Sequence, residues 1–358
     1  MAKNPHLPPT LLDHTLWEKQ SNPIWLGTSF SLHRNLARSF FPGKLAQAEL
    51  QRTLLSLCDG LLTLPQLNHA SLLKAEELTP MDKEYLYEHF LSSRSFENTS
   101  NGQGFIVDDS GQFLALLNIQ DHLQIQWSDS EGTWESAWER LSKIEAELSK
   151  RAEFAYSPRF GYLTSDPHLC GTGLIVKAYL HIPALIHSKK LQELLQQEKE
   201  ESVEATGLGE HEDLWIGDIL ILRNRFTLGV SEENILSTIH GAAMKWMGAE
   251  KSIRKELASQ ENSAIKDEVC RAYGLLTHSY ELKTQEVLEA LSLLNLGCDL
   301  NWVTGISPMQ LDTLFFRCQR AHLLNTLEKQ EATASEIPHL RAQFLHEQMR
   351  PVSCKLEQ

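Results

Sequence analysis

The chain has 358 residues, of which 42% are hydrophobic and 22% are charged, and its formal net charge is −14. These proportions are typical of a globular protein with about two domains, and the acidic balance argues against nucleic acid as a partner. No apolar run reaches membrane length and no basic-then-apolar leader opens the chain, so we expect a cytoplasmic protein without membrane contact. Six cysteines without Cys-x-x-Cys spacing indicate reduced, buried thiols.

The first part of the chain, about residues 1–95, predicts a small helical lobe. Apolar residues recur at helical spacing from Ala46 to Leu62 and from Asp82 to Leu91. From Gly104 to Trp127 the pattern alternates as in strands, and a Ser-Gly turn interrupts it, which predicts an antiparallel meander. An amphipathic helix is expected from Thr133 to Ser149.

The middle of the chain predicts a mixture of helices and strands. The charged, glutamine-rich run from Lys189 to Glu201 indicates a solvated helix with a mobile loop behind it. A strand is expected from Leu214 to Leu222. Ser231 and the two glutamates after it predict the start of a long helix toward Leu257.

The last part of the chain predicts helices only. The polar run Ala258 to Asp267 is the expected boundary between a first domain, residues 1–258, and a second domain, residues 268–358. Beyond it, helices are expected over Val269 to Leu276, over Thr284 to Leu294, and from Ser307, where Gln310 completes a capping box. The consecutive apolar residues Leu314, Phe315 and Phe316 favour a partner helix or second subunit over intramolecular packing.

The segment FGYLTSDPHLCGTGLIVKAYLHIPALI, residues 160–186, predicts a strand, a tight turn and a buried element. Together with GTSFSLHRN at 27–35, LLNIQDHLQIQ at 116–126 and the blocks between 206 and 235, it resembles the ATP:guanidino phosphotransferases, most closely the bacterial protein-arginine kinases. The resemblance implies an α+β fold, with a small helical lobe, an antiparallel sheet flanked by helices over residues 96–258, and a helical C-terminal domain.

The resemblance also implies where the reactive residues of the family would stand. The positions of its five phosphate-binding arginines carry Ser29, Ser31, Gln124, Ile175 and Ala205. Its two adjacent glutamates, the second of which is the catalytic base, correspond to Ile119 and Gln120, and its reactive cysteine corresponds to Asp166. Glu210 matches the glutamate of the mobile loop and is the catalytic acid that remains.

These replacements predict a protein without phosphoryl transfer. Each charge-assisted hydrogen bond contributes roughly 1.5–3 kcal/mol, so the loss of five arginines removes on the order of 10 kcal/mol as a non-additive upper figure. Each ~1.4 kcal/mol is a tenfold change in affinity. We therefore expect a pseudokinase that binds neither ATP nor magnesium, needs no cofactor, and acts by binding or regulating other proteins.

Two alternatives remain open. The first is an active protein-arginine kinase, with ATP and magnesium, whose nucleotide site is rebuilt around Arg34, Arg223 or Arg225. The second is a phosphoarginine reader, because protein-arginine kinases carry a phosphoarginine pocket with the motif Arg-Asp-x-x-Arg-Ala. Here Ile337 and Pro338 begin the corresponding segment and Arg341 with Ala342 end it, so half of the motif is missing.

The resemblance further implies a homodimer and an adaptor of the kind that accompanies protein-arginine kinases. A metal site is not expected. His211 lacks the second histidine of a His-Glu-x-x-His motif, since Trp215 stands there, and His168 with Cys170 has no second pair of ligands nearby. Asp166 is interpreted as a turn residue rather than a new catalytic acid.

Overall fold

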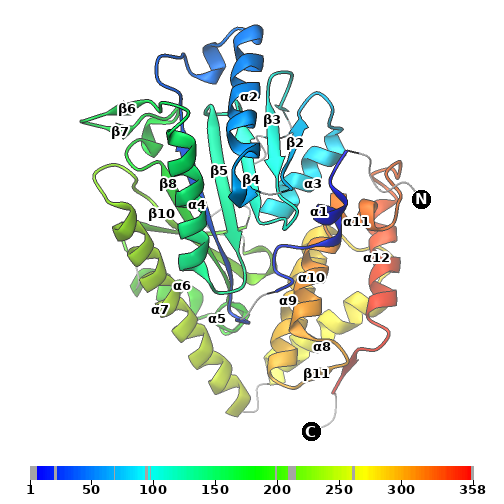
Figure 1. The fold of residues 1–358 in the computed structure, drawn as a ribbon. Helices are drawn as coiled ribbons and strands as arrows, with labels where there is room; N and C mark the ends of the chain where they lie inside the picture. Colours follow the sequence, from blue (N-terminus) through cyan, green and yellow to red (C-terminus); the bar gives the residue numbers. More distant parts are fainter. Residues whose placement is uncertain are drawn as a thin grey trace. The chain divides into compact units, whose positions relative to one another are not determined.

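The computed structural model describes residues 6–19, 22–67, 69–92, 96, 98–197, 200–208, 215–259 and 263–355 (Figure 1). The chain divides into two compact units that interleave along the sequence. The first comprises Met1–Leu16, Gly27–Lys177 and Asn224–Ile239, and the second comprises Trp17–Leu26, Ala178–Arg223 and His240–Gln358. The sequence predicts a single domain boundary between residues 258 and 268, and that boundary remains a prediction.

The first unit is built on a sheet with the strand order β2-β3-β4-β5-β1-β8, in which β8 contributes its first half. The pairs β2–β3, β3–β4, β4–β5 and β5–β1 are antiparallel, and Phe30 of β1 lies opposite Trp127 of β5. The strands are β1 (Trp25–Arg34), β2 (Ser71–Lys74), β3 (Gly104–Val107), β4 (Phe113–Leu117), β5 (Leu123–Asp129) and β8 (Leu174–His181).

Two helices of the first unit cover one face of this sheet, as Figure 1 shows for α2 (Gln47–Leu62) and α4 (Trp134–Ser149). The α4 face carries Trp134 and Trp138, whose rings lie 6.4 and 6.1 Å from the ring of Phe30. A Cβ at Gly60 would lie 2.7 Å from Leu148, so the missing side chain allows the two helices to approach. The unit also contains α1 (Pro9–Asp13), α3 (Pro80–Phe90), η1 (Pro42–Lys44), η2 (Pro65–Leu67), η4 (Pro167–Leu169) and the hairpin β6 (Tyr156–Ser157) with β7 (Gly161–Tyr162).

The meander predicted between Gly104 and Trp127 is confirmed as β3, β4 and β5, but β1 and β2 were not expected within the helical lobe. Strand β1 was not predicted because its polar residues are buried. Every residue from Leu26 to Arg34 is buried, and five of them are polar: Thr28, Ser29, Ser31, His33 and Arg34. A strand with polar side chains on a buried face shows neither the alternation nor the apolar run by which strands are predicted.

The second unit contains the strand order β8-β10-β9, with the second half of β8, and most of the helices. Its central helix is α9 (Thr284–Asp299), which packs against α8 and α10 and has nine buried residues. The remaining elements are α5 (Pro183–His187), α6 (Leu191–Gln197), β9 (Val203–Gly207), η5 (Ile216–Asp218), β10 (Ile219–Asn224), the part of α7 (Glu232–Ser259) from His240 onward, α8 (Ser263–His278), β11 (Val303–Thr304), α10 (Pro308–Arg317), α11 (Arg320–Thr326), α12 (Ile337–Gln348) and β12 (Ser353–Cys354).

Several predicted helices of this unit are confirmed. The helix from Ser307 begins as predicted, because the Ser307 side chain accepts a hydrogen bond from the Gln310 backbone N–H at 3.2 Å. The polar run from Ala258 to Asp267, predicted as a domain boundary, includes the end of one helix and the start of the next. Within its described residues α7 continues to Ser259 and α8 starts at Ser263. A polar run of this length can therefore include the exposed ends of helices and not only the connection between them.

The trio Leu314, Phe315 and Phe316 is buried within the second unit itself. The ring of Trp17 lies 5.1 Å from Phe315 and 4.9 Å from Phe316. Intramolecular packing therefore accounts for these side chains, and they no longer argue for a second subunit. Among the described residues, no helix is long and apolar enough to cross a membrane.

Candidate functional site

The adjacent strands β1 and β5 bring together three of the predicted phosphate-site positions. Ser29 and Ser31 lie on β1 and are 4% and 7% exposed, and Gln124 lies on β5. The Gln124 Nε2 donates a hydrogen bond to the Ser31 Oγ at 3.0 Å. These three positions therefore hold neutral side chains, and two of them, Ser31 and Gln124, are joined by a hydrogen bond between the two strands.

The fourth predicted position, Ile175, lies at the start of β8 and is 6% exposed. Gly173, two residues before Ile175, has a φ of +62°. Its carbonyl accepts a hydrogen bond from the backbone N–H of His33 at 3.0 Å. Ile175 thus adds a buried apolar side chain to the unit. The fifth position, Ala205, lies in β9 of the second unit, where it is half-buried.

The positions that correspond to the family's two glutamates and cysteine carry Ile119, Gln120 and Asp166, which differ in exposure and contacts. Ile119 is half-buried and Gln120 is exposed at the turn after β4. The carboxylate of Asp166 accepts the backbone N–H of His168 at 3.0 Å and caps the short helix η4, as expected of a turn residue. Glu210, the retained loop glutamate, lies outside the described residues, as does His211.

Around these changed positions, buried hydrogen bonds hold the neighbouring segments together. The carboxylate of Asp121, 2% exposed, accepts from His33 Nδ1 at 3.1 Å, from Asn35 Nδ2 at 2.6 Å and from the backbone N–H of Ser165 at 2.6 Å. Burial alone would raise the pKa of Asp121, but the hydrogen bonds and charge of His33, with those of Ser165 and Asn35, lower it. The carboxylate therefore fixes β1 and the 160–186 segment in place as a charged group.

Arg34 does not supply a relocated phosphate ligand. It is 1% exposed, and its Nε donates to Glu145 at 2.8 Å. Its Nη1 donates to the carbonyls of His33 and Thr172 at 2.9 and 2.8 Å, and its guanidinium lies 3.6 Å from the ring centroid of Tyr162. Of the other two candidates, Arg225 is exposed in the first unit and Arg223 is half-buried in the second.

Arg341, the retained arginine of the phosphoarginine motif, lies 2% exposed on α12. Its Nε donates to the carbonyl of Cys318 and its Nη1 to the carbonyl of Leu282, both at 2.7 Å. A guanidinium that joins two backbone segments in this way is a structural group. In the described part of the chain, no cluster of three or more histidine, cysteine, aspartate or glutamate side chains could hold a metal ion.

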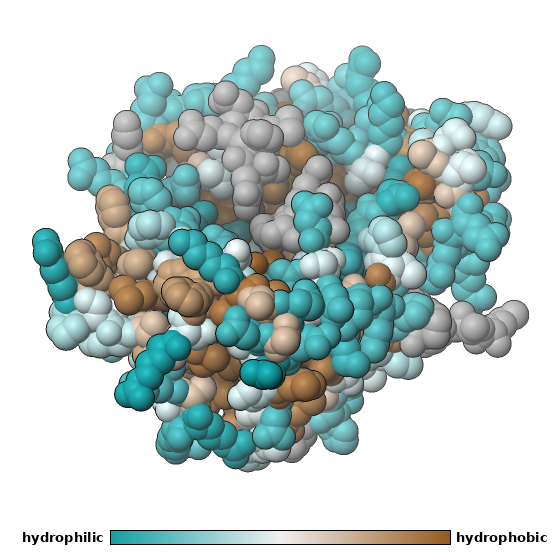
Figure 2. Space-filling view, turned by 90° about the horizontal axis from the view of Figure 1, so that it is seen from above, coloured by the Kyte–Doolittle hydropathy of each residue, from teal (hydrophilic) through white to brown (hydrophobic). Residues whose placement is uncertain are grey.

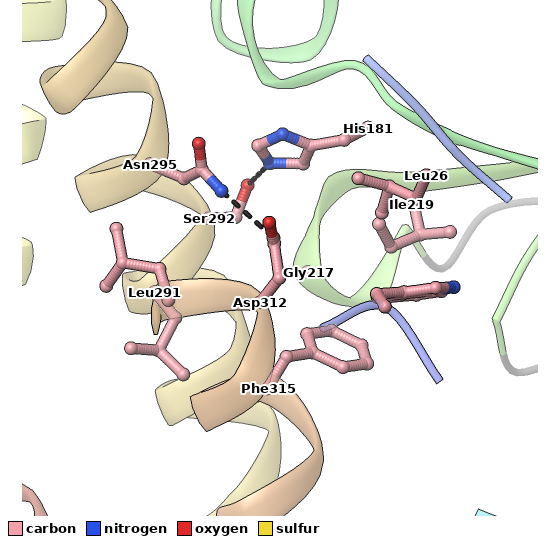
Figure 3. A pocket seen from close by; sticks show the side chains of 11 residues that line it. Leu26, His181, Gly217, Ile219, Leu291, Ser292, Asn295, Asp312 and Phe315 are labelled. Carbon is pink, nitrogen blue, oxygen red and sulfur yellow. Dashed lines mark hydrogen bonds between the residues drawn. The ribbon is translucent and has the colours of Figure 1, made fainter. Parts of the chain in front are cut away.

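A buried polar cluster in the second unit was missed by the sequence analysis (Figure 3). His181 Nε2 lies 2.6 Å from Ser292 Oγ, and that hydroxyl donates to Asp218 Oδ2 at 2.5 Å. The cavity beside it, about 10 Å³, holds one water at most. Burial, followed by the charge of Arg254, lowers the pKa of His181 well below its usual range. The signal for this cluster was the pair of polar residues, Ser292 and Asn295, within the apolar run of α9.

This cluster has the residue types of a catalytic triad but not the arrangement. In a triad the histidine stands between the serine and the carboxylate, so that it can take the proton of the hydroxyl. Here Ser292 stands between His181 and Asp218 and is 5% exposed. The cluster therefore stabilises the contact between β8, η5 and α9 and offers no nucleophile to a substrate.

Comparison with known proteins gives two matching family models. Residues 59–253 match the model of the ATP:guanido phosphotransferase C-terminal catalytic domain, and residues 262–358 match that of the protein-arginine kinase McsB C-terminal domain. A protein of Chlamydia pneumoniae named protein-arginine kinase is 35% identical, with 97% of this chain and 98% of that protein covered. One of Syntrophomonas wolfei with the same name is 31% identical, with 84% of each covered.

Solved structures support the fold alone, because their sequence identity is low. Lombricine kinase is similar with a TM-score of 0.57 and 16% identity, covering 70% of this chain and 72% of that one. The duplicated taurocyamine kinase from Schistosoma mansoni gives a TM-score of 0.58 and 19% identity, covering 73% of this chain and 38% of that one. With a family model over more than half of its length and full-length relatives above 30% identity, the chain belongs to the ATP:guanidino phosphotransferase family and has the C-terminal domain of the protein-arginine kinases.

Proposed function

We propose that this protein is a protein-arginine-kinase homologue that acts by binding other proteins and does not transfer phosphate. The observation that carries this proposal is the hydrogen bond from the half-buried Gln124 to the buried Ser31, at 3.0 Å, where the family places arginines. Transfer of the terminal phosphoryl group of ATP depends on positioned cations around the phosphates. A hydroxyl and an amide that bond each other place no cation at these two positions.

The alternative is an active protein-arginine kinase, and it is favoured by the name that the relatives carry. Under this alternative the phosphates are held by cations at other positions. Arg34 is excluded from that role by its bonds to Glu145 and Thr172, which leaves Arg225 and Arg223 as candidates. Such a site would also need a base in place of Gln120.

The proposal includes a protein partner, namely an adaptor of the kind that accompanies protein-arginine kinases, and a homodimer in the cytoplasm. The helical C-terminal domain supports it, because the same domain is present in the matched family. A phosphoarginine reader remains a weaker candidate, since Arg341 is committed to two carbonyls.

Isothermal titration of the full chain with magnesium ATP tests the proposal. We expect no heat of binding up to millimolar nucleotide, and no phosphoarginine on an arginine-rich acceptor protein by mass spectrometry. The Syntrophomonas wolfei relative, which is named a protein-arginine kinase, serves as the reference in both assays. A micromolar dissociation constant, or phosphoarginine formed by the full chain, would establish the alternative instead.

A further inference from the structure

Three titratable side chains of the second unit lie together where α5, η5 and α8 meet. His187, the last residue of α5, has its Nε2 3.2 Å from Asp218 Oδ2 in η5. Its Nδ1 lies 2.7 Å from Glu268 Oε2 in α8. Hydrophilic side chains usually point to water, as many do on the face in Figure 2, but the side chain of His187 is 21% exposed and that of Asp218 is 6% exposed.

The spacing of residues along α5 and α8 produces this contact. Ala184 of α5 and Ile265 of α8 belong to the same buried core cluster. His187 and Glu268 each follow three residues later, and residues three apart lie on the same face of a helix. The apolar contact and the ionic contact are therefore made by the same faces of the two helices. Both helices belong to one compact unit, so the contact does not depend on how the two units are placed.

The two carboxylates can both be bonded only by a charged His187. A neutral imidazole has one N–H and donates to one acceptor, whereas a protonated imidazole donates from both nitrogens. Here each nitrogen faces a carboxylate oxygen, and an ionised carboxylate only accepts. Burial alone would lower the pKa of His187, but the hydrogen bond and charge of Asp218, with those of Glu268, raise it.

The other charged groups around α5 are neutral or have partners of their own. Burial keeps the pKa of His181 on β8 well below its usual range, and its Nε2 meets Ser292, whose hydroxyl donates to Asp218 (Figure 3). Lys266 on α8 lies near Cys354. The remaining charged groups form ion pairs: Arg254 of α7 with Glu250 and with Asp299 of α9, Lys190 with Glu256, and Arg271 with Asp267.

We propose that His187 is a pH-dependent bridge, which holds the first turns of α8 on α5 while it is protonated and releases them when it loses its proton. Deprotonation leaves one ring nitrogen without a hydrogen, facing a carboxylate. Asp218 stays in place, because it is enclosed and Ser292 donates to it. The Glu268 side chain is 44% exposed and turns to water instead. Helix α8 begins the segment that matches the McsB C-terminal domain, so the hold on that segment depends on pH.

The direction of the pH effect follows from the raised pKa of His187 in the folded chain. The bridge contributes fully below the unfolded value of about 6.5 and is lost as the pH rises through the folded value. This inference goes beyond the proposed function, because none of the three residues stands at a predicted nucleotide position. The bridge acts whether or not the protein transfers phosphate, so its failure and that of the nucleotide experiment are distinguishable.

The first test is a titration of the histidine ring signals of the full chain by NMR, with the His187 signal assigned by its loss in His187→Gln. We expect a midpoint above about 6.5, the value of an unperturbed histidine. The midpoint should fall in Glu268→Gln, because one of the two carboxylates is removed. A midpoint at or below the unperturbed value overturns the proposal.

The second test is hydrogen exchange of the full chain, measured by mass spectrometry and corrected for the intrinsic exchange rate at each pH. Protection of the first turns of α8 should fall at least ~3-fold between about pH 6 and pH 9, the size of effect expected for a partly exposed ion pair. This pH dependence should disappear in His187→Gln. It should persist in His278→Gln, the matched control, because His278 is exposed at the end of the same helix.

Equal protection at both pH values in the parent protein, or the same pH dependence in His187→Gln, would refute the bridge. If His187→Gln melts at lower temperature than the parent, Glu268→Gln decides, because its side chain is partly exposed and contributes less to folding. That variant should also lose the pH dependence, since a neutral amide no longer repels the neutral ring. A pH dependence unchanged from that of the parent would overturn the proposal.

Discussion

At the residue scale, three of the changed positions bond to other groups of the chain. Ser31 and Gln124 bond each other, and Asp166 caps η4 instead of presenting a thiolate. Asp121 accepts hydrogen bonds from three donors on two segments, His33 and Asn35 on the first and Ser165 on the second. Buried polar groups that are fully paired stabilise a fold, whereas a catalytic site needs groups whose partner is the substrate.

This difference predicts the outcome of a partial restoration. The double change Asp166→Cys and Gln120→Glu should give no detectable arginine phosphorylation, because a base and a thiolate are ineffective without cations to hold the phosphates. Mass spectrometry of an arginine-rich acceptor protein after incubation with magnesium ATP measures this. Phosphoarginine formed by the double variant but not by the parent would show that other cations already bind the nucleotide.

The Asp121 contacts predict a measurable loss of stability. Asp121→Asn removes the charge that accepts from His33, Asn35 and Ser165, and should lower the free energy of unfolding by about 2–3 kcal/mol. Asp267→Asn is the matched control, because Asp267 is an exposed partner of Arg271 and its loss should cost less than ~1 kcal/mol. Urea unfolding of the two variants gives the comparison, and equal midpoints would contradict the prediction.

The lowered pKa of Asp121 also predicts a pH dependence. A carboxyl whose pKa is lower in the folded than in the unfolded state binds its proton first in the unfolded state. Its contribution is therefore complete above the unfolded value of about 3.9 and is lost as the pH falls through the folded value. Unfolding free energies between about pH 3 and pH 6 should fall more steeply toward acid for the parent than for Asp121→Asn. Parallel curves of unfolding free energy against pH for the two proteins would show that Asp121 does not cause this pH dependence.

At the element scale, the structure corrects the expectation of six buried thiols. Cys58 and Cys318 are buried, while Cys170, Cys270, Cys298 and Cys354 are half-buried. Cys270 on α8 and Cys354 on β12 lie with their sulfurs 3.3 Å apart. Tyr273 holds the same two elements together through a hydrogen bond from its hydroxyl to the carbonyl of Val352 at 3.1 Å.

These two thiols should be joined by mild oxidation. Diamide takes up two hydrogens from the pair and becomes a hydrazine, which leaves one disulfide between α8 and β12. Burial and the hydrogen bond with Cys270 raise the pKa of Cys354 to about 12, so the reaction should speed up as the pH is raised. The link would close a loop across 84 residues and should stabilise the fold by about 4.5 kcal/mol in the chain-entropy estimate.

Peptide mapping by mass spectrometry measures this link. The loss of two hydrogens should appear on the Cys270 and Cys354 peptides, and it should disappear in Cys270→Ser. Cys298→Ser is the control, since Cys298 lies elsewhere on α9 and should leave the link intact. Linkage of Cys354 to another cysteine in the parent protein would contradict the assignment.

At the scale of the whole molecule, the predicted homodimer rests on the family resemblance. The packing of Phe315 and Phe316 on Trp17 removes the argument that those residues need a second subunit. The resemblance still leads us to expect twice the mass of the chain in light scattering at micromolar concentration. The mass of one chain at every concentration in a dilution series would contradict it.

How much the sequence could predict differs between the elements. The helices α2 and α4 and the cap at Ser307 were predictable, because their signals lie within a few neighbouring residues. Strand β1 was not, because its polar residues are buried by partners far along the chain. The extent of α7 and α8 into the polar run likewise depends on packing rather than on composition.

The sequence by itself determined the family and the identity of the residues at its reactive positions, because ordered motifs are read without coordinates. Only the tertiary structure decided what those residues do. The bond between Gln124 and Ser31 joins residues 93 positions apart, and the one between Arg34 and the Thr172 carbonyl joins residues 138 apart. The physical reason is that such contacts depend on strand register and close packing, which arise from many weak long-range interactions and leave no local pattern in the sequence.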